Sequence, residues 1–391
     1  MTHSFQIHRR ALLSGVTAGI GLAYAGRAGA QPRAGRNKLI MVVARGAMDG
    51  LSVTIPYQDP DYAVLRGGLA ISPPGQEDGA LALSDGFGLH PALATLHGLH
   101  GNGQLRFAPA VAIPARIRSH FDAQDVLENG GGRLREQNDG WLNRALAATG
   151  GNGLSIGAQT PLILRGATPI SSWAPGGNVR GGDRIASLLQ DLYVDHPMLG
   201  DSLARGLETE ALAAMSDDGA PVRRNDAGGM GQAVGRLMTG EAGADLVALS
   251  VDGWDTHARQ RAQMQSRLTG LDQLIGGLRA GLGEEWDRTI VVVTTEFGRT
   301  VRVNGTQGTD HGTASSLLLS GGALKSGGPI GDWPTLAENR LFEGRDLAPT
   351  LDVRSVFKGV LRDHIGVDRA VLDTQVFPDS AREAPGVSGL V

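Results

Sequence analysis

Short, mostly apolar runs of strand length place the strongest limit on how this chain can fold. Three of them span Leu39–Val43, Leu246–Val251 and Thr289–Thr294. Residues 104–114 contain a fourth run, and Leu317–Leu319 lies in a fifth. A strand that is apolar on both faces has to be covered on both faces, as in a parallel sheet between layers of helices. We therefore predict buried strands at these positions.

One segment between two of these runs has the spacing of a helix instead. Its apolar residues recur at intervals of mostly three and four, which is typical of an amphipathic helix. The alternation of strands with such helices predicts an α/β fold, specifically a three-layer α/β/α sandwich with a largely parallel central sheet. The apolar residues of the helical segment are Met264, Leu268, Leu271, Leu274, Ile275, Leu278 and Leu282.

The composition limits the class of protein further. The chain has 391 residues, of which 41% are hydrophobic and 19% charged, an ordinary globular balance. It contains no cysteine, which excludes disulfides, thiolate metal sites and a cysteine nucleophile. The net charge of −4 and the lack of a basic block argue against a nucleic-acid partner. We interpret residues 37–380 as a single domain, with an insertion or cap at about residues 150–235.

The first 30 residues have the pattern of an export signal. Arg9-Arg10 precedes a weakly apolar stretch at residues 11–26, and Ala28-Gly29-Ala30 resembles a cleavage site. This pattern predicts a twin-arginine signal peptide over residues 1–30 and a periplasmic or secreted protein; a flexible basic tail is the alternative. Because the apolar stretch is short and rich in glycine, we expect no stable membrane span in the mature protein.

Potential metal ligands follow the ends of several predicted strands. In an open α/β sheet, the carboxyl ends of parallel strands meet at the edge where ligands bind. Carboxylates and neutral imidazoles at that edge would suit a divalent ion such as Zn, Mn, Mg or Ca. The sequence therefore predicts a metal site there. Its candidate ligands are Asp49, Asp252, Asp255, His257, Asp310 and His311.

The Asp310-His311 pair lies in a glycine-rich segment between two predicted strands. In an extended strand, adjacent side chains point to opposite faces, so both could reach one site only if the backbone turns. Gly308 and Gly312 flank the pair and would permit a turn. Glu296 is the candidate for holding His311 in its ligating tautomer. The alternative is that Asp310 and Glu296 hydrogen-bond loop N–H groups and that His311 packs against the sheet. Arg299 could face a bound anion.

The segment RSHFDAQD allows two interpretations. Ser119 with Asp122 three residues later fits a helix N-cap. Ser119 could equally be a nucleophile activated by a metal ion, and Arg116 and Arg118 could hold phosphate or sulfate oxygens. His120 could then be a ligand or a general acid.

Several segments together resemble a known bacterial family. They include ARGAMDGLSVTIPY, RSHFDAQD, VDGWDTH and TEFGRTVRVNGTQGTDHGT. From about Leu39 to the C-terminal region, the chain resembles the family catalogued as domain of unknown function 1501. That family is grouped with the alkaline phosphatase and sulfatase superfamily, whose members are α/β/α sandwiches with metal sites at the sheet edge. The resemblance implies that Asp49 and Asp310-His311 bind one metal and that Ser119 is the nucleophile.

The resemblance also implies a second metal, bound by His257 with Asp252 or Asp255. Here the sequence departs from the phosphatase pattern, because those residues are not spaced four apart. The implied function is an exported metal-dependent hydrolase of phosphate or sulfate esters, or a related group transferase, acting on an anionic ester. The alternative is a non-catalytic exported binding or assembly protein that keeps the fold, with or without one structural metal.

Overall fold

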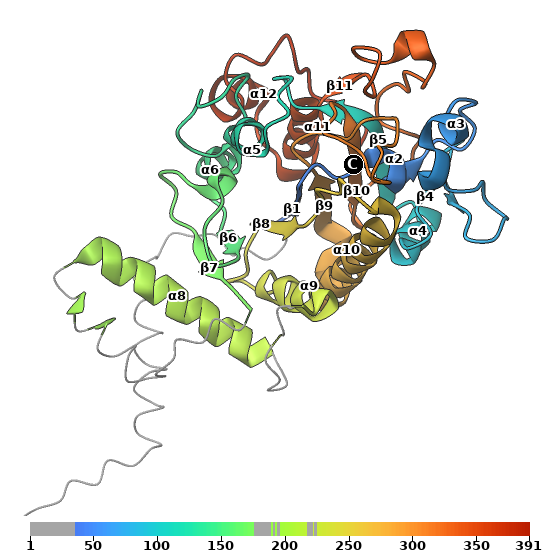
Figure 1. Ribbon diagram of the computed structural model, residues 1–391. Coiled ribbons are helices and arrows are strands. Elements are labelled where there is room, and N and C mark those ends of the chain that lie inside the picture. Colours follow the sequence, from blue (N-terminus) through green and yellow to red (C-terminus); the bar gives the residue numbers. More distant parts are fainter. Residues whose placement is uncertain (1–35, 176–188, 191, 194–195, 217–221, 223–224) are drawn as a thin grey trace, which may run out of the picture. The chain divides into compact units, whose positions relative to one another are not determined.

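The computed structural model describes residues 36–175, 189–190, 192–193, 196–216, 222 and 225–391 (Figure 1). The chain divides into one unit that ends at Arg36 and a second unit, Asn37–Val391. All elements below belong to the second unit. The predicted signal peptide lies outside the described residues.

The strands and helices alternate along the described chain. The strands are β1 (Lys38–Arg45), β2 (Thr54–Ile55), β3 (Leu81–Ala82), β4 (Gly88–Leu89), β5 (Leu105–Ala112), β6 (Gly153–Ile156), β7 (Ser171–Trp173), β8 (Leu246–Asp252), β9 (Thr289–Thr294), β10 (Ser315–Ser320) and β11 (Leu351–Asp352). The α-helices are α2 (Gly50–Val53), α3 (Tyr62–Arg66), α4 (Ala94–Gly101), α5 (His120–Asn129), α6 (Trp141–Thr149), α8 (Pro197–Ser216), α9 (Ala227–Leu237), α10 (Gln260–Leu282), α11 (Val353–Val360) and α12 (Arg369–Val371).

The main sheet has eight strands in the order β11-β5-β10-β9-β1-β8-β6-β7. Strand β10 runs antiparallel to both of its neighbours, and the other pairings are parallel. The prediction of a largely parallel sheet is therefore confirmed. Strands β2, β4 and β3, in that order, form a second, small sheet.

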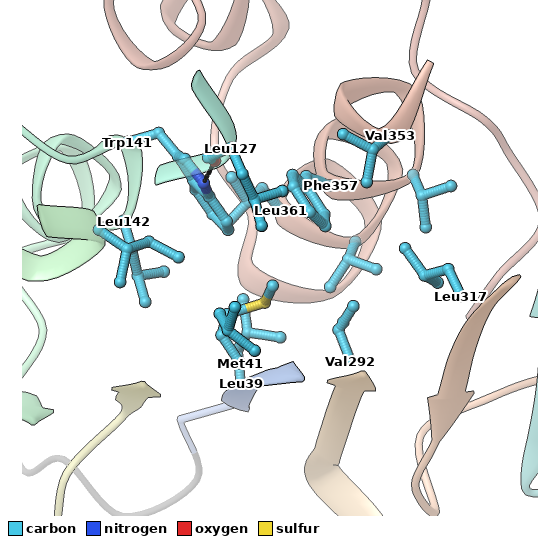
Figure 2. Close-up of a cluster of buried hydrophobic side chains, with 14 of the residues drawn as sticks. Leu39, Met41, Leu127, Trp141, Leu142, Val292, Leu317, Val353, Phe357 and Leu361 are labelled. Carbon is cyan, nitrogen blue, oxygen red and sulfur yellow. Dashed lines mark hydrogen bonds between the residues drawn. The ribbon is translucent and has the colours of Figure 1, made fainter. Parts of the chain in front are cut away.

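Alternate residues of the central strands face two separate cores, as the period of a strand requires. On β1, Leu39, Met41 and Val43 face a core that also contains side chains of α5, α6 and α11 (Figure 2). Ile40 and Val42 face the other core, together with side chains of α4, α9 and α10. The sheet is thus covered by helices on both faces, and the predicted three-layer α/β/α arrangement is confirmed.

The region expected to be an insertion or cap contributes to the sheet itself. Strands β6 and β7 lie within residues 150–235 and form the edge beyond β8. They are only four and three residues long. Both are too short to give the apolar run by which the other strands were recognised.

Helices α9 and α10 pack at backbone distance along a seam of glycines. A Cβ atom on Gly277 would lie 2.0 Å from the carbonyl oxygen of Gly228, and one on Gly281 would lie 2.1 Å from that of Gln232. Neither position has room for a side chain. These glycines allow the backbones of α9 and α10 to pack directly against each other, and both helices contribute side chains to the same core.

The direction of β10 brings residues 295–314 to the edge at which the parallel strands end. Because β9 and β10 are antiparallel neighbours, residues 295–314 leave and re-enter the sheet at the same edge. The carboxyl ends of β1, β5 and β8 lie at that edge too, since these strands run parallel to β9. The segments after β5, β8 and β9 can therefore meet there.

Candidate metal centre

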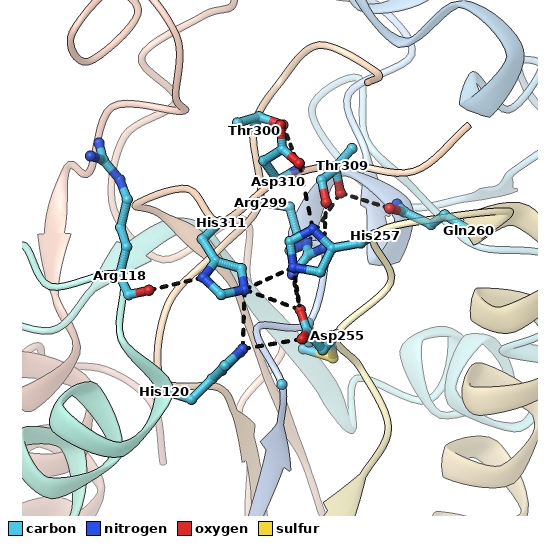
Figure 3. Close-up of polar contacts among 12 residues, drawn as sticks. Arg118, His120, Asp255, His257, Gln260, Arg299, Thr300, Thr309, Asp310 and His311 are labelled. Atoms are coloured by element: carbon cyan, nitrogen blue, oxygen red, sulfur yellow. Dashed lines mark hydrogen bonds and ion pairs between the residues drawn. The ribbon is translucent and has the colours of Figure 1, made fainter. Parts of the chain in front are cut away.

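Three histidines and one aspartate meet at this edge (Figure 3). The Nε2 atom of His311 lies 3.1 Å from Nε2 of His120 and 3.0 Å from Nε2 of His257. Oδ1 of Asp255 lies 3.1 Å from Nε2 of His311 and 2.9 Å from Nε2 of His257. Ligand atoms of His120, Asp255 and His311 all lie within 4.8 Å of one another. These four residues are the cluster discussed below.

The other ring nitrogen of each histidine faces a hydrogen-bond acceptor. Nδ1 of His311 lies 2.9 Å from the carbonyl oxygen of Arg118, and Nδ1 of His120 lies 2.8 Å from Oε1 of Glu296. Nδ1 of His257 lies 3.4 Å from Oδ1 of Asp310. These partners assign the hydrogen of a neutral ring to Nδ1 and leave a lone pair on Nε2. Histidines that bind metals are usually held in this way.

The Nε2 lone pairs and the Asp255 carboxylate would repel one another without a positive charge between them. A proton on His311 can satisfy one of the three contacts of its Nε2 atom, whereas a cation can satisfy several at once. Zn–N bonds of about 2.0–2.1 Å would place tetrahedral ligand atoms about 3.3 Å apart. The donor atoms of His120, Asp255 and His311 lie 3.1, 3.1 and 3.5 Å from one another, close to that spacing. Imidazole and carboxylate donors also suit Mn²⁺ and related ions. The donor set therefore fits a divalent metal.

Glu296 is the buried acid behind His120. Besides His120, its carboxylate accepts hydrogen bonds from the Gly46 N–H (2.8 Å), Gln124 Nε2 (3.1 Å) and Thr295 Oγ1 (2.9 Å). Burial alone would raise the pKa of Glu296, but these hydrogen bonds, led by that of His120, outweigh it and lower the pKa. The hydrogen bond to Glu296 in turn raises the pKa of His120, against the effect of burial.

Arg299 holds the carboxylate of Asp255. The Nη1 atom of Arg299, whose side chain is fully buried, lies 2.7 Å from Oδ1 of Asp255. Burial opposes ionisation of Asp255, but its contacts, first the hydrogen bond from Arg299 and then the contact with His311, lower its pKa nevertheless. Oδ2 of Asp255 lies on the side of His120, 3.5 Å from its Nε2 atom. The carboxylate is thus charged and fixed in orientation.

Asp49 and Asp252, both predicted ligands, are not brought into the cluster. Asp49 is buried, and its carboxylate is used by Arg66, by Gln260 and by the Ser52 hydroxyl at 2.7 Å. Asp252 is the last residue of β8 and is exposed to solvent. Of the two aspartates considered with His257, the structure therefore brings Asp255 into the cluster.

The side chains of Asp310 and His311 do not reach one common site. His311 forms an antiparallel bridge with Arg299, so the backbone is extended and the two side chains diverge. Only His311 joins the cluster, while Asp310 faces Nδ1 of His257. The flanking glycines serve close approach instead of a turn: a Cβ atom on Gly308 would lie 2.2 Å from the carbonyl carbon of His257.

Glu296 supports a different histidine from the one expected. It hydrogen-bonds His120, and the carbonyl of Arg118 supports His311. A backbone carbonyl has no signal in a sequence, so that partner could not be found there. The role of Gln124 did have a signal, because it lies one helical turn after His120 on the same face of α5.

The three predicted anion-binding guanidinium groups all make protein contacts. Arg118 points away from the cluster toward Glu343 (2.6 Å) and Asp346 (2.7 Å). Arg116 donates to the carbonyl of Ile113, and Arg299 is buried against Asp255. Arg118 therefore contributes to the centre through its carbonyl instead of its charge.

Ser119 is the N-cap residue of α5, and its side chain makes no capping hydrogen bond. The predicted capping bond is therefore not formed. Ser119 is exposed and directly precedes His120 in the chain. Its hydroxyl is not committed to the helix and remains available to a ligand.

Fold and site together define an α/β protein with a candidate histidine–aspartate metal centre at the carboxyl edge of its sheet. The chain belongs to the family DUF1501, described as "protein of unknown function", whose family model matches residues 36–376. A search of curated proteins found no match. Within the described residues, no helix has the length and apolar character needed to cross a membrane.

Solved structures give only distant similarities. The C-terminal periplasmic domain of EcEptC from Escherichia coli in complex with Zn has 10% identity and a TM-score of 0.39, with 88% of this chain and 86% of that chain covered. Phosphonate monoester hydrolase of Agrobacterium radiobacter has 11% identity and a TM-score of 0.36, with 85% and 74% covered. Ps i-CgsB has 11% identity and a TM-score of 0.39, with 90% and 77% covered. These scores are too low to support an argument about function.

Proposed function

We propose that this protein is an exported metal-dependent hydrolase of phosphate or sulfate esters, or a related group transferase. The observation that carries the proposal is the convergence of three Nε2 atoms and the Asp255 carboxylate at one sheet edge. The cluster is also open to solvent: exposed side-chain fractions are 23% for His120, 25% for His311 and 45% for Asp255 and His257. His120, His311 and Asp255 offer three mutually close donor atoms, and a tetrahedral ion held by three protein ligands keeps one open position for substrate, as in catalytic metal sites.

The roles follow from the positions of the side chains. His120, His311 and Asp255, with His257 beside them, would hold a divalent ion, which when bound supplies a Lewis acid for the ester oxygens. Ser119 lies at the N-terminus of the ten-residue helix α5, where N–H groups and the helix dipole favour an anion.

In the proposed reaction, the Ser119 Oγ atom bonds to phosphorus or sulfur as the bond to the ester oxygen breaks. The Ser119 hydroxyl loses its proton, and the alcohol leaves with one. Water then releases phosphate or sulfate and restores the hydroxyl; in a transferase, a second alcohol takes the place of water.

Metal content and turnover test the proposal together. The purified protein should contain a stoichiometric divalent metal by elemental mass spectrometry, and it should cleave a member of a panel of aryl phosphate, phosphodiester and aryl sulfate esters. His311→Ala should lose both the metal and the turnover. His100→Ala, at the end of α4, is the matched control and should keep both. A parent protein that binds no divalent metal would refute the proposal. Bound metal without turnover would favour the non-catalytic binding protein instead.

We also propose that residues 1–30 direct export by the twin-arginine route. Replacement of Arg9-Arg10 by two lysines should leave the protein in the cytoplasm, because that route requires the arginine pair. Cell fractionation measures the outcome. Unchanged export of the lysine variant would contradict the proposal.

A further inference from the structure

We propose that Thr309 and Gln260 are positioning residues for the metal centre, acting on Asp255 through Arg299. The inference rests on the proposed metal-binding function and adds residues that do not touch the cluster. It comes from a chain of buried hydrogen bonds that runs from Asp255 into the protein interior (Figure 3).

The first link is the clamp that Thr309 forms on Arg299. The Nε atom of Arg299 donates to the Thr309 hydroxyl (3.2 Å), and Nη2 donates to the Thr309 carbonyl. The third contact of the guanidinium group is the bond of Nη1 to Asp255 (2.7 Å). Thr309 therefore holds two edges of the planar, rigid guanidinium group of Arg299. The bond from Nη1 of Arg299 then sets the position of the Asp255 carboxylate.

The second link fixes the hydroxyl of Thr309. Its oxygen accepts from Arg299, so its single hydrogen is free to donate to Oε1 of Gln260, at 2.6 Å. The Nε2 atom of Gln260 donates to the carboxylate of Asp49, which is paired with the buried Arg66. Arginine can only donate and an ionised carboxylate can only accept, so the hydroxyl and the amide between them have one consistent orientation.

Thr309 also joins the two segments that carry the cluster. Its N–H lies 3.3 Å from the carbonyl of Thr256, which stands between Asp255 and His257. In the same segment as Thr309, the Thr306 hydroxyl donates to the carbonyl of His257 at 2.6 Å. A shift of Thr309 would therefore move Asp255 and His257 relative to His311.

The test replaces the Thr309 hydroxyl while keeping the shape of the side chain. Thr309→Val leaves Nε of Arg299 and Oε1 of Gln260 without their partner. We expect Zn²⁺ affinity, measured by competition with a chromophoric chelator, to fall about tenfold, the lower end of the range for residues behind a ligand. The visible spectrum of the Co²⁺-substituted protein should also change, because it reports the geometry of the ligands.

Two further variants separate positioning from general stability. Thr309→Ser restores the hydroxyl and should recover the parent's Zn²⁺ affinity and Co²⁺ spectrum. Thr350→Val makes the same substitution at a hydroxyl that donates to the Asp332 carbonyl (2.7 Å), and it should change neither readout. If Thr309→Val does not fold, Gln260→Met provides the same measurement one link further from the centre.

The outcomes distinguish this inference from the proposed function. A parent that binds Zn²⁺, with Thr309→Val or Gln260→Met showing the same affinity and the same Co²⁺ spectrum, would overturn the positioning role and leave the metal centre intact. A parent that binds no metal would overturn both. The double variant of Thr309→Val and Gln260→Met should lose little more affinity than either alone, because both act through one chain of bonds.

Discussion

Glu296→Gln is the sharpest test of how the candidate centre is built. The substitution keeps the shape of the side chain and removes its charge. An amide oxygen at the Oε1 position can still accept from His120, Gly46 and Gln124. The new amide nitrogen would face Thr295 Oγ1, whose hydrogen can instead go to the Ala44 carbonyl at 2.7 Å. The variant should therefore fold, with the second hydrogen of the new amide as the one added buried donor that lacks a partner.

The expected effect follows from the change in one hydrogen bond. The bond from His120 to a carboxylate is charge-assisted, and such bonds contribute about 1.5–3 kcal/mol against about 0.5–1.5 kcal/mol for neutral ones. The loss of about 1.4 kcal/mol corresponds to a tenfold weaker affinity. Because the lost charge makes the His120 ring a weaker donor to a metal, we expect Zn²⁺ affinity to fall about tenfold.

Chelator competition at neutral pH measures that affinity for the parent and the variant. Glu343→Gln is the matched control, because Glu343 contacts the Arg118 side chain and none of the histidines; it should bind Zn²⁺ like the parent. Affinity in Glu296→Gln within about twofold of the parent would refute the idea that Glu296 tunes His120 as a ligand, since the range for such residues begins at about tenfold.

Three other predictions concern stability and the role of Ser119. Gly277→Ala places a Cβ atom 2.0 Å from the Gly228 carbonyl, so overpacking of about 1–3 kcal/mol should exceed the gain in helix propensity and lower the melting temperature. Gly270→Ala, in the same helix with no atom within 4 Å, should raise it. Burial and a nearby arginine lower the pKa of His90 from 6.5 to about 4. Between these values the unfolded chain binds more protons than the folded one, so stability that is complete above pH 6.5 is lost on acidification. His90→Gln should therefore lose about 2 kcal/mol less than the parent between pH 7 and pH 5 in urea titrations, and an equal loss would contradict this. Ser119→Ala should change the unfolding free energy by less than about 0.5 kcal/mol, since no capping bond is formed, while turnover of a cleaved ester is abolished. A normal rate in that variant would exclude the nucleophile.

The fold could be predicted from the sequence for those elements whose burial requires a recognisable arrangement of apolar residues. The run Thr289–Thr294 coincides with β9, and the helical spacing after Met264 falls within α10. Each of these elements faces a core along its length, so its apolar residues follow the arrangement typical of a buried strand or of an amphipathic helix. Strands β6 and β7 are short and lie beyond β8, and they leave no comparable pattern.

The residues of the cluster could be predicted from the sequence, but their hydrogen-bond partners could be predicted less well. His120, Asp255, His257 and His311 were all among the candidates, because they follow strands that end at one edge. The role of Asp49 could not be predicted, since it depends on meeting Arg66 and Gln260 in the interior. Local sequence does not record which carboxylate meets which hydrogen-bond donor across 17 or 211 positions.

The place of β1 in the sheet has a consequence for how the chain folds. β1 is the first strand of the described chain, yet it lies at the centre, where Leu39 pairs with Leu246 of β8 and Ile290 of β9. At roughly 5–20 residues per second, a ribosome needs roughly 10 to 50 s after making β1 to complete both partners. Until the end of that time an apolar strand lacks at least one of its two neighbours, and slow closure of such distant pairings exposes a nascent chain to aggregation. Closure of the sheet around β1 is thus a late event in synthesis.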